Sequence, residues 1–139
     1  MELVNLRGNT YALEDFNRIG FYVYNKDEVA VIDTGLNDES GKAIIEVCEK
    51  QGWKIKMIIN THAHPDHVGG NKIISDSLGV PIYAFGIEQI ISNNPLLGLA
   101  IVSGGNPSKY MKKIFLRPVL GALPLTEEVL PSSLVTMRK

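Results

Sequence analysis

Cysteine is nearly absent from this sequence, whose 139 residues contain only Cys48. A single cysteine excludes a disulfide within one copy of the chain and is compatible with a reducing compartment. Cys48 shares an apolar stripe with Ala43, Ile44 and Val47 at helical spacing. We therefore interpret Cys48 as a small core residue rather than a reactive thiol.

An excess of charge of one sign and a long apolar run are also absent. The chain has 14 Lys and Arg against 15 Asp and Glu, a formal net charge of −1, so no basic field favours nucleic acid. No apolar run approaches the length that spans a bilayer, and the segment from Glu2 to Arg7 lacks the apolar core of a secretory signal. We expect a cytoplasmic protein with a small-molecule partner that binds neither nucleic acid nor membrane.

What is present is an alternation of short apolar runs and turn residues over a length typical of one domain. Predicted strands cover residues 2–6, 10–13, 20–24, 29–32, 55–60 and 80–83. Predicted helices cover residues 38–52 (capped by Asp38 or Ser40 and ended by Gly52), 71–78, and a short stretch from Ile87. Beyond Leu96 the pattern weakens, with a short helix over 108–116 and an edge strand over 134–137. Hairpins followed by β-α-β-α-β predict an α/β protein with one mixed sheet.

All three histidines of the chain lie within six residues, in the run His62-Ala63-His64-Pro65-Asp66-His67. The run follows a predicted strand, so His62 and His64 point the same way if the chain stays extended there. Pro65 favours this, because it biases the residue before it away from helical geometry. Asp66 and His67 then turn in from the other side of the loop. Three imidazoles beside a carboxylate indicate a metal site.

The residue types suggest which metal site this is. Neutral imidazole suits zinc, iron, nickel and copper, and a carboxylate adds manganese. A closed structural zinc site typically uses cysteine, and Cys48 lies elsewhere in the sequence. A site rich in imidazole and carboxylate is instead of the catalytic type, in which the metal lowers the pKa of its bound water to about 7.

The segment from Thr61 to Gly70 resembles the signature loop of the metallo-β-lactamase superfamily, and Val31-Ile32-Asp33-Thr34-Gly35 resembles that family's upstream element. The resemblance implies an αββα sandwich with metals at one edge of the sheets. It implies that His62 and His64 bind a first metal, and that Asp66 and His67 bind a second. Asp33 is then a supporting residue behind the loop, and Asp66 also orients the attacking water. Zinc is the expected metal, up to two ions per complete site, with iron or manganese as alternatives.

The chain departs from the family pattern after the loop. The family completes its site with a further histidine, a bridging aspartate and a last histidine, whereas no histidine follows His67 here. Asp76 lies too close to the loop to serve as the bridging residue. We therefore expect residues 1–139 to form a single incomplete domain, the N-terminal αβ half of the sandwich. Strands 21–24, 29–32 and 55–59 are expected to be apolar on both faces, and two copies should pair sheet against sheet as a homodimer.

These observations favour a metal-dependent hydrolase, in which metal-bound hydroxide attacks an ester, amide, thioester or phosphoester. The presence of His64 disfavours the flavodiiron branch, which carries a carboxylate at that place. Three alternatives stay open: an inactive, self-associating fragment, an RNA or DNA nuclease, and an iron-dependent oxygenase of the same fold. The net charge counts against the nuclease.

Overall fold

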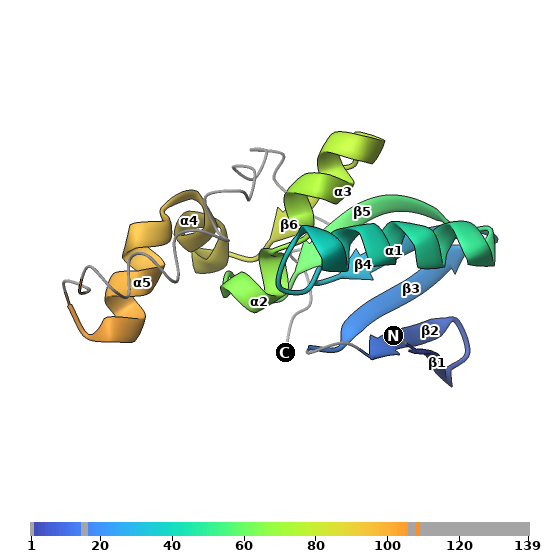
Figure 1. Cartoon of the computed structure of the whole chain (residues 1–139), viewed down its shortest axis with the longest axis horizontal. Coiled ribbons are helices and arrows are strands. Elements are labelled where there is room, and N and C mark those ends of the chain that lie inside the picture. Colours follow the sequence, from blue (N-terminus) through green and yellow to red (C-terminus); the bar gives the residue numbers. More distant parts are fainter. Residues whose placement is uncertain (1, 15–16, 106–107, 109–139) are drawn as a thin grey trace.

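The computed structural model describes residues 2–14, 17–105 and 108, which form one six-stranded sheet with helices packed on it (Figure 1). The strands are β1 (Glu2–Arg7), β2 (Thr10–Glu14), β3 (Ile19–Asn25), β4 (Glu28–Ile32), β5 (Lys54–Asn60) and β6 (Ile82–Ala84). The helices are α1 (Asp38–Gln51), α2 (Pro65–Val68), α3 (Asn71–Leu78), α4 (Ile87–Asn93) and α5 (Pro95–Ser103). Strand order follows chain order; β1 to β4 are antiparallel, and β4, β5 and β6 are parallel. The predicted mixed sheet is confirmed.

Helices α1 and α3 cover one face of the sheet. Ile44 of α1 and Ile74 of α3 are fully buried against Phe21 and Ile58. Cys48 is 2% exposed in the same core, and burial raises the pKa of its thiol to about 12. The thiol is therefore protonated at neutral pH, which confirms its interpretation as a core residue.

The two ends of α1 differ in how well the sequence predicted their capping residues. Gly52 adopts the left-handed conformation that ends the helix, as predicted. The predicted caps Asp38 and Ser40 are wrong, because Asn37 caps the helix and its side-chain oxygen accepts the backbone N–H of Ser40 at 3.0 Å. Asp38 instead occupies the first turn, where a carboxylate is favoured by the helix dipole.

The second half of the described chain departs further from the prediction. Strand β6 begins at Ile82, after Pro81, which has no N–H to pair but accepts the N–H of Ile58 through its carbonyl at 3.0 Å. Helix α5 was not predicted. Ser108 is not part of a helix. The rest of the predicted helix and the predicted strand over 134–137 lie outside the described residues. No described helix has the length and apolar character needed to cross a membrane.

The second face of the sheet carries a continuous row of apolar positions. Cross-strand pairing aligns one residue of each strand on this face: Val4, Ala12, Gly20, Ile32, Ile59 and Tyr83. Strand β4 is buried on both faces, as predicted, but burial alternates along β3 and β5. On β3, Tyr22 and Tyr24 point to the second face and are 49% and 40% exposed.

Candidate metal centre

The histidine loop lies at the carboxyl edge of the parallel part of the sheet. Because β4 and β5 run parallel, the residues that follow them meet at one edge, where open α/β sheets bind their ligands. Backbone hydrogen bonds join the two loops: the N–H of Thr34 donates to His67 O at 2.8 Å, and that of Gly69 donates to Gly35 O at 2.8 Å. The second half of the histidine loop is the one-turn helix α2, so the extended conformation predicted for the loop ends at His64.

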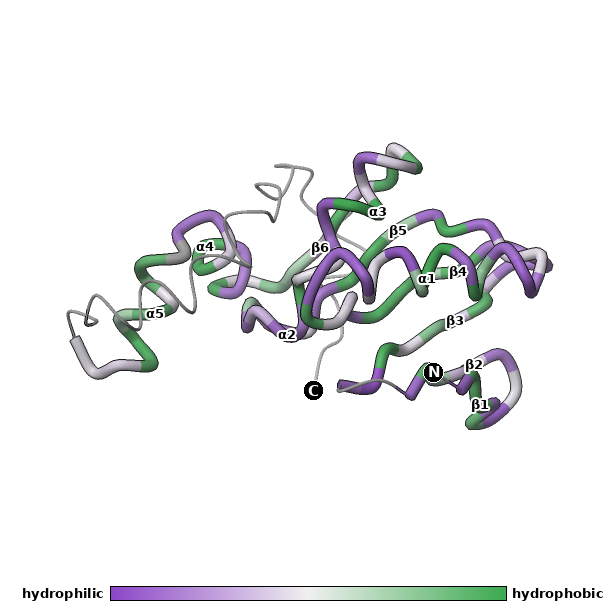
Figure 2. The backbone as a smooth tube through the Cα atoms, in the orientation of Figure 1, coloured by the Kyte–Doolittle hydropathy of each residue, from purple (hydrophilic) through white to green (hydrophobic). Residues whose placement is uncertain are grey.

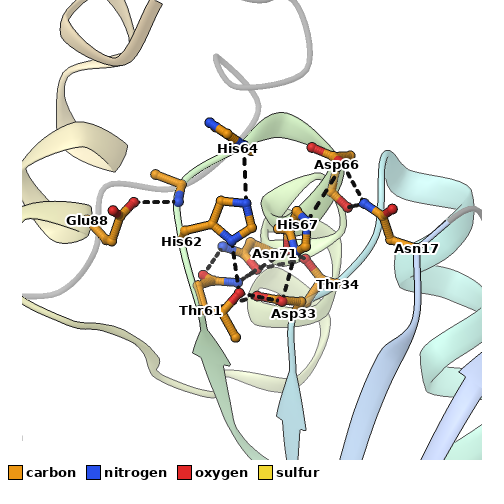
Figure 3. A network of polar contacts seen from close by, with 12 residues as sticks. Asn17, Asp33, Thr34, Thr61, His62, His64, Asp66, His67, Asn71 and Glu88 are labelled. Carbon is orange, nitrogen blue, oxygen red and sulfur yellow. Dashed lines mark hydrogen bonds and ion pairs between the residues drawn. The ribbon is translucent and has the colours of Figure 1, made fainter. Parts of the chain in front are cut away.

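Asp33 organises the loop from behind. Its carboxylate accepts the backbone N–H of Thr61 at 2.8 Å and the Thr61 hydroxyl at 2.7 Å, and its Oδ2 lies 2.8 Å from Nδ1 of His67. Asp33 is 5% exposed and adopts a left-handed backbone, with φ of 61°. Since an ionised carboxylate only accepts hydrogen bonds, Nδ1 of His67 must carry the proton and Nε2 presents its lone pair. Figure 3 shows this arrangement, in which Asp33 lies beneath the histidines.

One ring nitrogen of His62 lies close to one ring nitrogen of His64. Nε2 of His62 lies 3.1 Å from Nδ1 of His64. The Thr61 hydroxyl, already donating to Asp33, accepts from Nδ1 of His62 at 3.0 Å, which leaves Nε2 of His62 as the nitrogen with the lone pair. Two nitrogens bound to one tetrahedral zinc at about 2.05 Å would lie about 3.3 Å apart. At 3.1 Å the two nitrogens share a hydrogen bond in the metal-free chain, and the same spacing fits two ligands of one metal ion.

Asp66 and His67 form a second pair on α2. Oδ2 of Asp66 lies 3.7 Å from Nε2 of His67, and Nδ2 of Asn17 donates to the same Oδ2 at 2.5 Å. Burial acts to raise the pKa of the Asp66 carboxyl, but the hydrogen bonds from Asn17 and the backbone and the nearby histidines hold this pKa below its ordinary value. Asp66 is therefore ionised at neutral pH and can act as a metal ligand.

Desolvation by burial, followed by the proximity of His67 and His64, lowers the pKa of His62. His62 is therefore neutral at pH 7, which is the form that binds metals.

A buried amide network fixes the loop from below: Asn71 exchanges hydrogen bonds with Asn60 and accepts the Thr34 hydroxyl at 2.8 Å. Asn60 also donates to His67 O at 3.3 Å.

Two residues of the site were not singled out from the sequence. Asn17 precedes β3 and donates a hydrogen bond to Asp66 across 49 residues of chain. Glu88 of α4 accepts the backbone N–H of Ala63 at 2.8 Å and so ties α4 to the loop. Neither has a local sequence signal, since each acts through a partner distant in the chain.

The donor set is incomplete within the part of the chain that the structure describes. His62 and His64 converge, and so do Asp66 and His67, but no three His, Cys, Asp or Glu side chains there are arranged to hold one ion. A catalytic zinc normally has three protein ligands. The residues fit a metal in type and spacing, as two pairs that each lack a ligand.

The loop also forms one wall of a cavity of about 350 Å³. His62, His64 and Asp66 line it on one side, and residues of α4 and α5 line it on the other. Three of the four candidate ligands, His62, His64 and Asp66, therefore face this cavity.

Comparison with known proteins identifies relatives of this arrangement. The model of the family described as the metallo-beta-lactamase superfamily matches residues 17–136. The hydroxyacylglutathione hydrolase of Erythrobacter litoralis is 42% identical over 83 residues, covering 53% of this chain and 32% of that protein. The hydroxyacylglutathione hydrolase of Buchnera aphidicola is 36% identical over 92 residues, covering 63% of this chain and 33% of that protein. The chain spans about a third of the length of these two relatives.

Solved structures show the same fold. BJP-1, a subclass B3 metallo-beta-lactamase of Bradyrhizobium japonicum, superposes with a TM-score of 0.58 at 27% identity. The match covers 67% of this chain and 36% of that one. MEM-A1, another subclass B3 enzyme, from a soil metagenome library, gives a TM-score of 0.59 at 24% identity over the same shares. The fold and the resemblance predicted from the loop are confirmed.

Proposed function

The chain belongs to the metallo-beta-lactamase superfamily, and we propose that its histidine loop supplies part of the metal site of a hydrolase that acts on thioesters. The observation that carries the proposal is the pair of His62 Nε2 and His64 Nδ1, 3.1 Å apart, on a loop fixed from behind by Asp33. The superfamily and the hydrolase relatives support a metal-dependent hydrolase. The choice of a thioester rests on the relatives' name, because an acyl group on the glutathione thiol is a thioester.

Each residue of the loop has a defined part in this proposal. His62 and His64 would hold one ion, and Asp66 and His67 a second, with zinc as the metal that suits imidazole and carboxylate best. A bound metal supplies a Lewis acid and lowers the pKa of a water to about 7. The Asp66 carboxylate, held by Asn17, would accept a hydrogen bond from a water at the site and orient it toward the substrate. Asp33 fixes the tautomer and the direction of His67.

We further propose that the partner is a small molecule and that the protein is cytoplasmic and acts on neither nucleic acid nor membrane. The cavity of about 350 Å³ beside the loop is of ligand size. The formal net charge of −1 offers no general attraction for a phosphate backbone or an anionic bilayer.

We expect this chain alone to hydrolyse an acyl-glutathione thioester no faster than zinc in buffer, because a metal held by only two ligands has no fixed geometry. The measurement is thioester absorbance over time with the zinc-loaded chain, against His62→Ala as the matched variant. Turnover by the chain that His62→Ala or a chelator removes would show that two ligands suffice, and would contradict this prediction while supporting the hydrolase.

The second sheet face leads us to propose a homodimer, with two copies paired sheet against sheet. Tyr22 remains 49% exposed at the centre of this face, beside the buried Ala30. Exposed aromatic side chains on this face, Tyr22 and Tyr24, favour association in a closed two-fold arrangement.

Sedimentation equilibrium at low micromolar concentration is expected to show a dimer that Tyr22→Lys weakens at least tenfold. The same substitution at Leu78, 44% exposed on α3, is the control and should leave the dimer unchanged. A monomeric chain that binds no hydrophobic dye, or equal effects of the two variants, would refute the pairing.

A further inference from the structure

Helices α4 and α5 pack against each other beside the candidate metal site, and they present apolar side chains to it. Helix α5 has no charged residue and is apolar around its whole circumference, and Glu88 is the one charged residue of α4. Figure 2 shows α5 mainly in the colours of apolar residues, at the end of the molecule away from β1 and β2. Helices that are apolar all round are normally covered. Yet Ile101 and Val102 are 56% and 57% exposed.

The exposed side of this helix pair faces the cavity of about 350 Å³. Ile91 of α4 and Leu99, Ile101 and Val102 of α5 line it, opposite the loop that carries His62, His64 and Asp66. Gly98 lets the two helices approach closely, since a Cβ there would lie 2.7 Å from Ile91 Cγ2. The cavity is therefore two-sided, with a metal-ligating polar wall and a helical apolar wall.

Glu88 links the apolar wall to the polar wall by a hydrogen bond. Its carboxylate accepts the backbone N–H of Ala63, the residue between the two histidines, at 2.8 Å. This contact fixes the start of α4 against the loop. A molecule whose reacting carbon lies at the metal-ligating wall would thus place its neighbouring atoms against α4 and α5.

We propose that the α4–α5 wall is the acyl-binding subsite of this protein, and that it selects a thioester with an unsubstituted aliphatic acyl group. The inference rests on the proposed function, because it assumes that the thioester carbon is held at the histidine loop. Among the residues that α4 and α5 contribute to the cavity lining, Ile91, Leu99, Ile101 and Val102 have no hydrogen-bonding side chain, and the Glu88 carboxylate already accepts the backbone N–H of Ala63 at the loop end of the wall. A hydroxyl on the acyl chain would lose its water on entry and gain no partner from the four apolar side chains.

The cavity is continuous with the candidate metal site, and its two walls differ in polarity. A polar wall at one end and an apolar wall at the other match a molecule with a carbonyl at one end and a hydrocarbon chain at the other. A second copy of the chain is the competing occupant. It would cover the exposed side chains of α5 that do not line the cavity, such as Leu97, as much as those that do.

Binding of a homologous thioester series to the full chain tests the proposal without requiring turnover. The probes are the acetyl, butyryl, hexanoyl and 2-hydroxyhexanoyl thioesters of N-acetylcysteamine, with dissociation constants from two-dimensional NMR titrations. We expect affinity to rise up to about fourfold per methylene, and 2-hydroxyhexanoyl to bind about tenfold more weakly than hexanoyl. Val102→Asn should weaken hexanoyl binding fivefold or more. Leu97→Asn, on the same helix but outside the cavity lining, should change it less than twofold.

Each outcome of the series has a meaning. Affinity independent of chain length, equal binding of hexanoyl and 2-hydroxyhexanoyl, or equal effects of the two variants overturns the subsite. Loss of self-association in both variants assigns the wall to a second copy and also overturns it. A separate zinc titration distinguishes failure of the acyl subsite from failure of the proposed function. Zinc bound by the histidine loop without acyl selectivity refutes the subsite alone, whereas acyl selectivity without zinc binding refutes the proposed function.

Discussion

Asp33→Asn is expected to lower the zinc affinity of the chain about 10- to 100-fold, the usual cost of removing a hydrogen-bonding partner of a metal ligand. The amide keeps one acceptor for the backbone N–H of Thr61 but places an NH₂ where Oδ2 accepted from the Thr61 hydroxyl and from Nδ1 of His67. Nδ1 of His67 can accept a hydrogen bond from this NH₂ only if the imidazole proton moves to Nε2. That shift removes the Nε2 lone pair needed for the metal. Asparagine tolerates the backbone φ of 61° well, so the variant tests the carboxylate rather than the turn.

The same substitution should also destabilise the metal-free chain by about 2 to 3 kcal/mol, because charge-assisted bonds are lost at a buried position. Urea unfolding measures this loss, and calorimetry measures the zinc affinity. Asp76→Asn is the matched control: its carboxylate is 49% exposed and forms a surface ion pair with Lys72, so both quantities should stay nearly constant. Equal zinc affinities for Asp33→Asn and the unaltered chain would contradict the role given to Asp33.

Gly69→Ala is expected to cost about 3 kcal/mol or more of stability, since an added methyl has no room. A Cβ at this position would lie 2.1 Å from the backbone carbon and oxygen of Leu36, where the Asp33 loop meets the histidine loop. Gly69 has φ of −61°, a conformation open to any residue, so the cost is one of contact and not of backbone strain. The only relief is to separate the two loops, which also breaks the hydrogen bond from Gly69 N–H to Gly35 O.

Gly79→Ala provides the comparison for this effect. Gly79 has φ of +65° and nothing within 4 Å of an added Cβ, so alanine there should cost about 1 to 2 kcal/mol, through strain alone. Urea unfolding of both variants, with unchanged m-values, gives the difference. A Gly69→Ala variant as stable as Gly79→Ala would show that the two loops can move apart without penalty.

The part of the site that was predictable from sequence is the part that local signals specify. Val31 to Gly35 ends an apolar run at a turn, and the histidine run follows the next apolar run, so both were placed at strand ends. Parallel pairing of β4 with β5 then brings them together. The pattern also placed Cys48 in the core correctly. The assignment of His62, His64, Asp66 and His67 as metal ligands remains a prediction supported by their spacing.

What the sequence did not reveal depends on distant contacts or on weak periodicity. Asn17 and Glu88 act on residues 49 and 25 positions away, and no spacing rule connects such partners. Helix α5 was missed because it is apolar on all sides and so lacks the stripe that marks a surface helix. Pro95 added to the ambiguity, because proline marks a break in many patterns but is also favoured in the first turn of a helix, where its missing N–H costs nothing.

Calorimetric titration of the metal-free chain with Zn²⁺ tests the central claim, that the loop between β5 and α3 is a metal site built from two incomplete ligand pairs. We predict measurable binding, weaker than the roughly 10 to 16 kcal/mol of closed four-ligand zinc sites. The double substitution His62→Ala and His64→Ala should remove at least one binding event, whereas Cys48→Ala should change nothing. Zinc binding unaffected by the double substitution would contradict the site, and tight uptake of two ions per monomer would contradict its incompleteness.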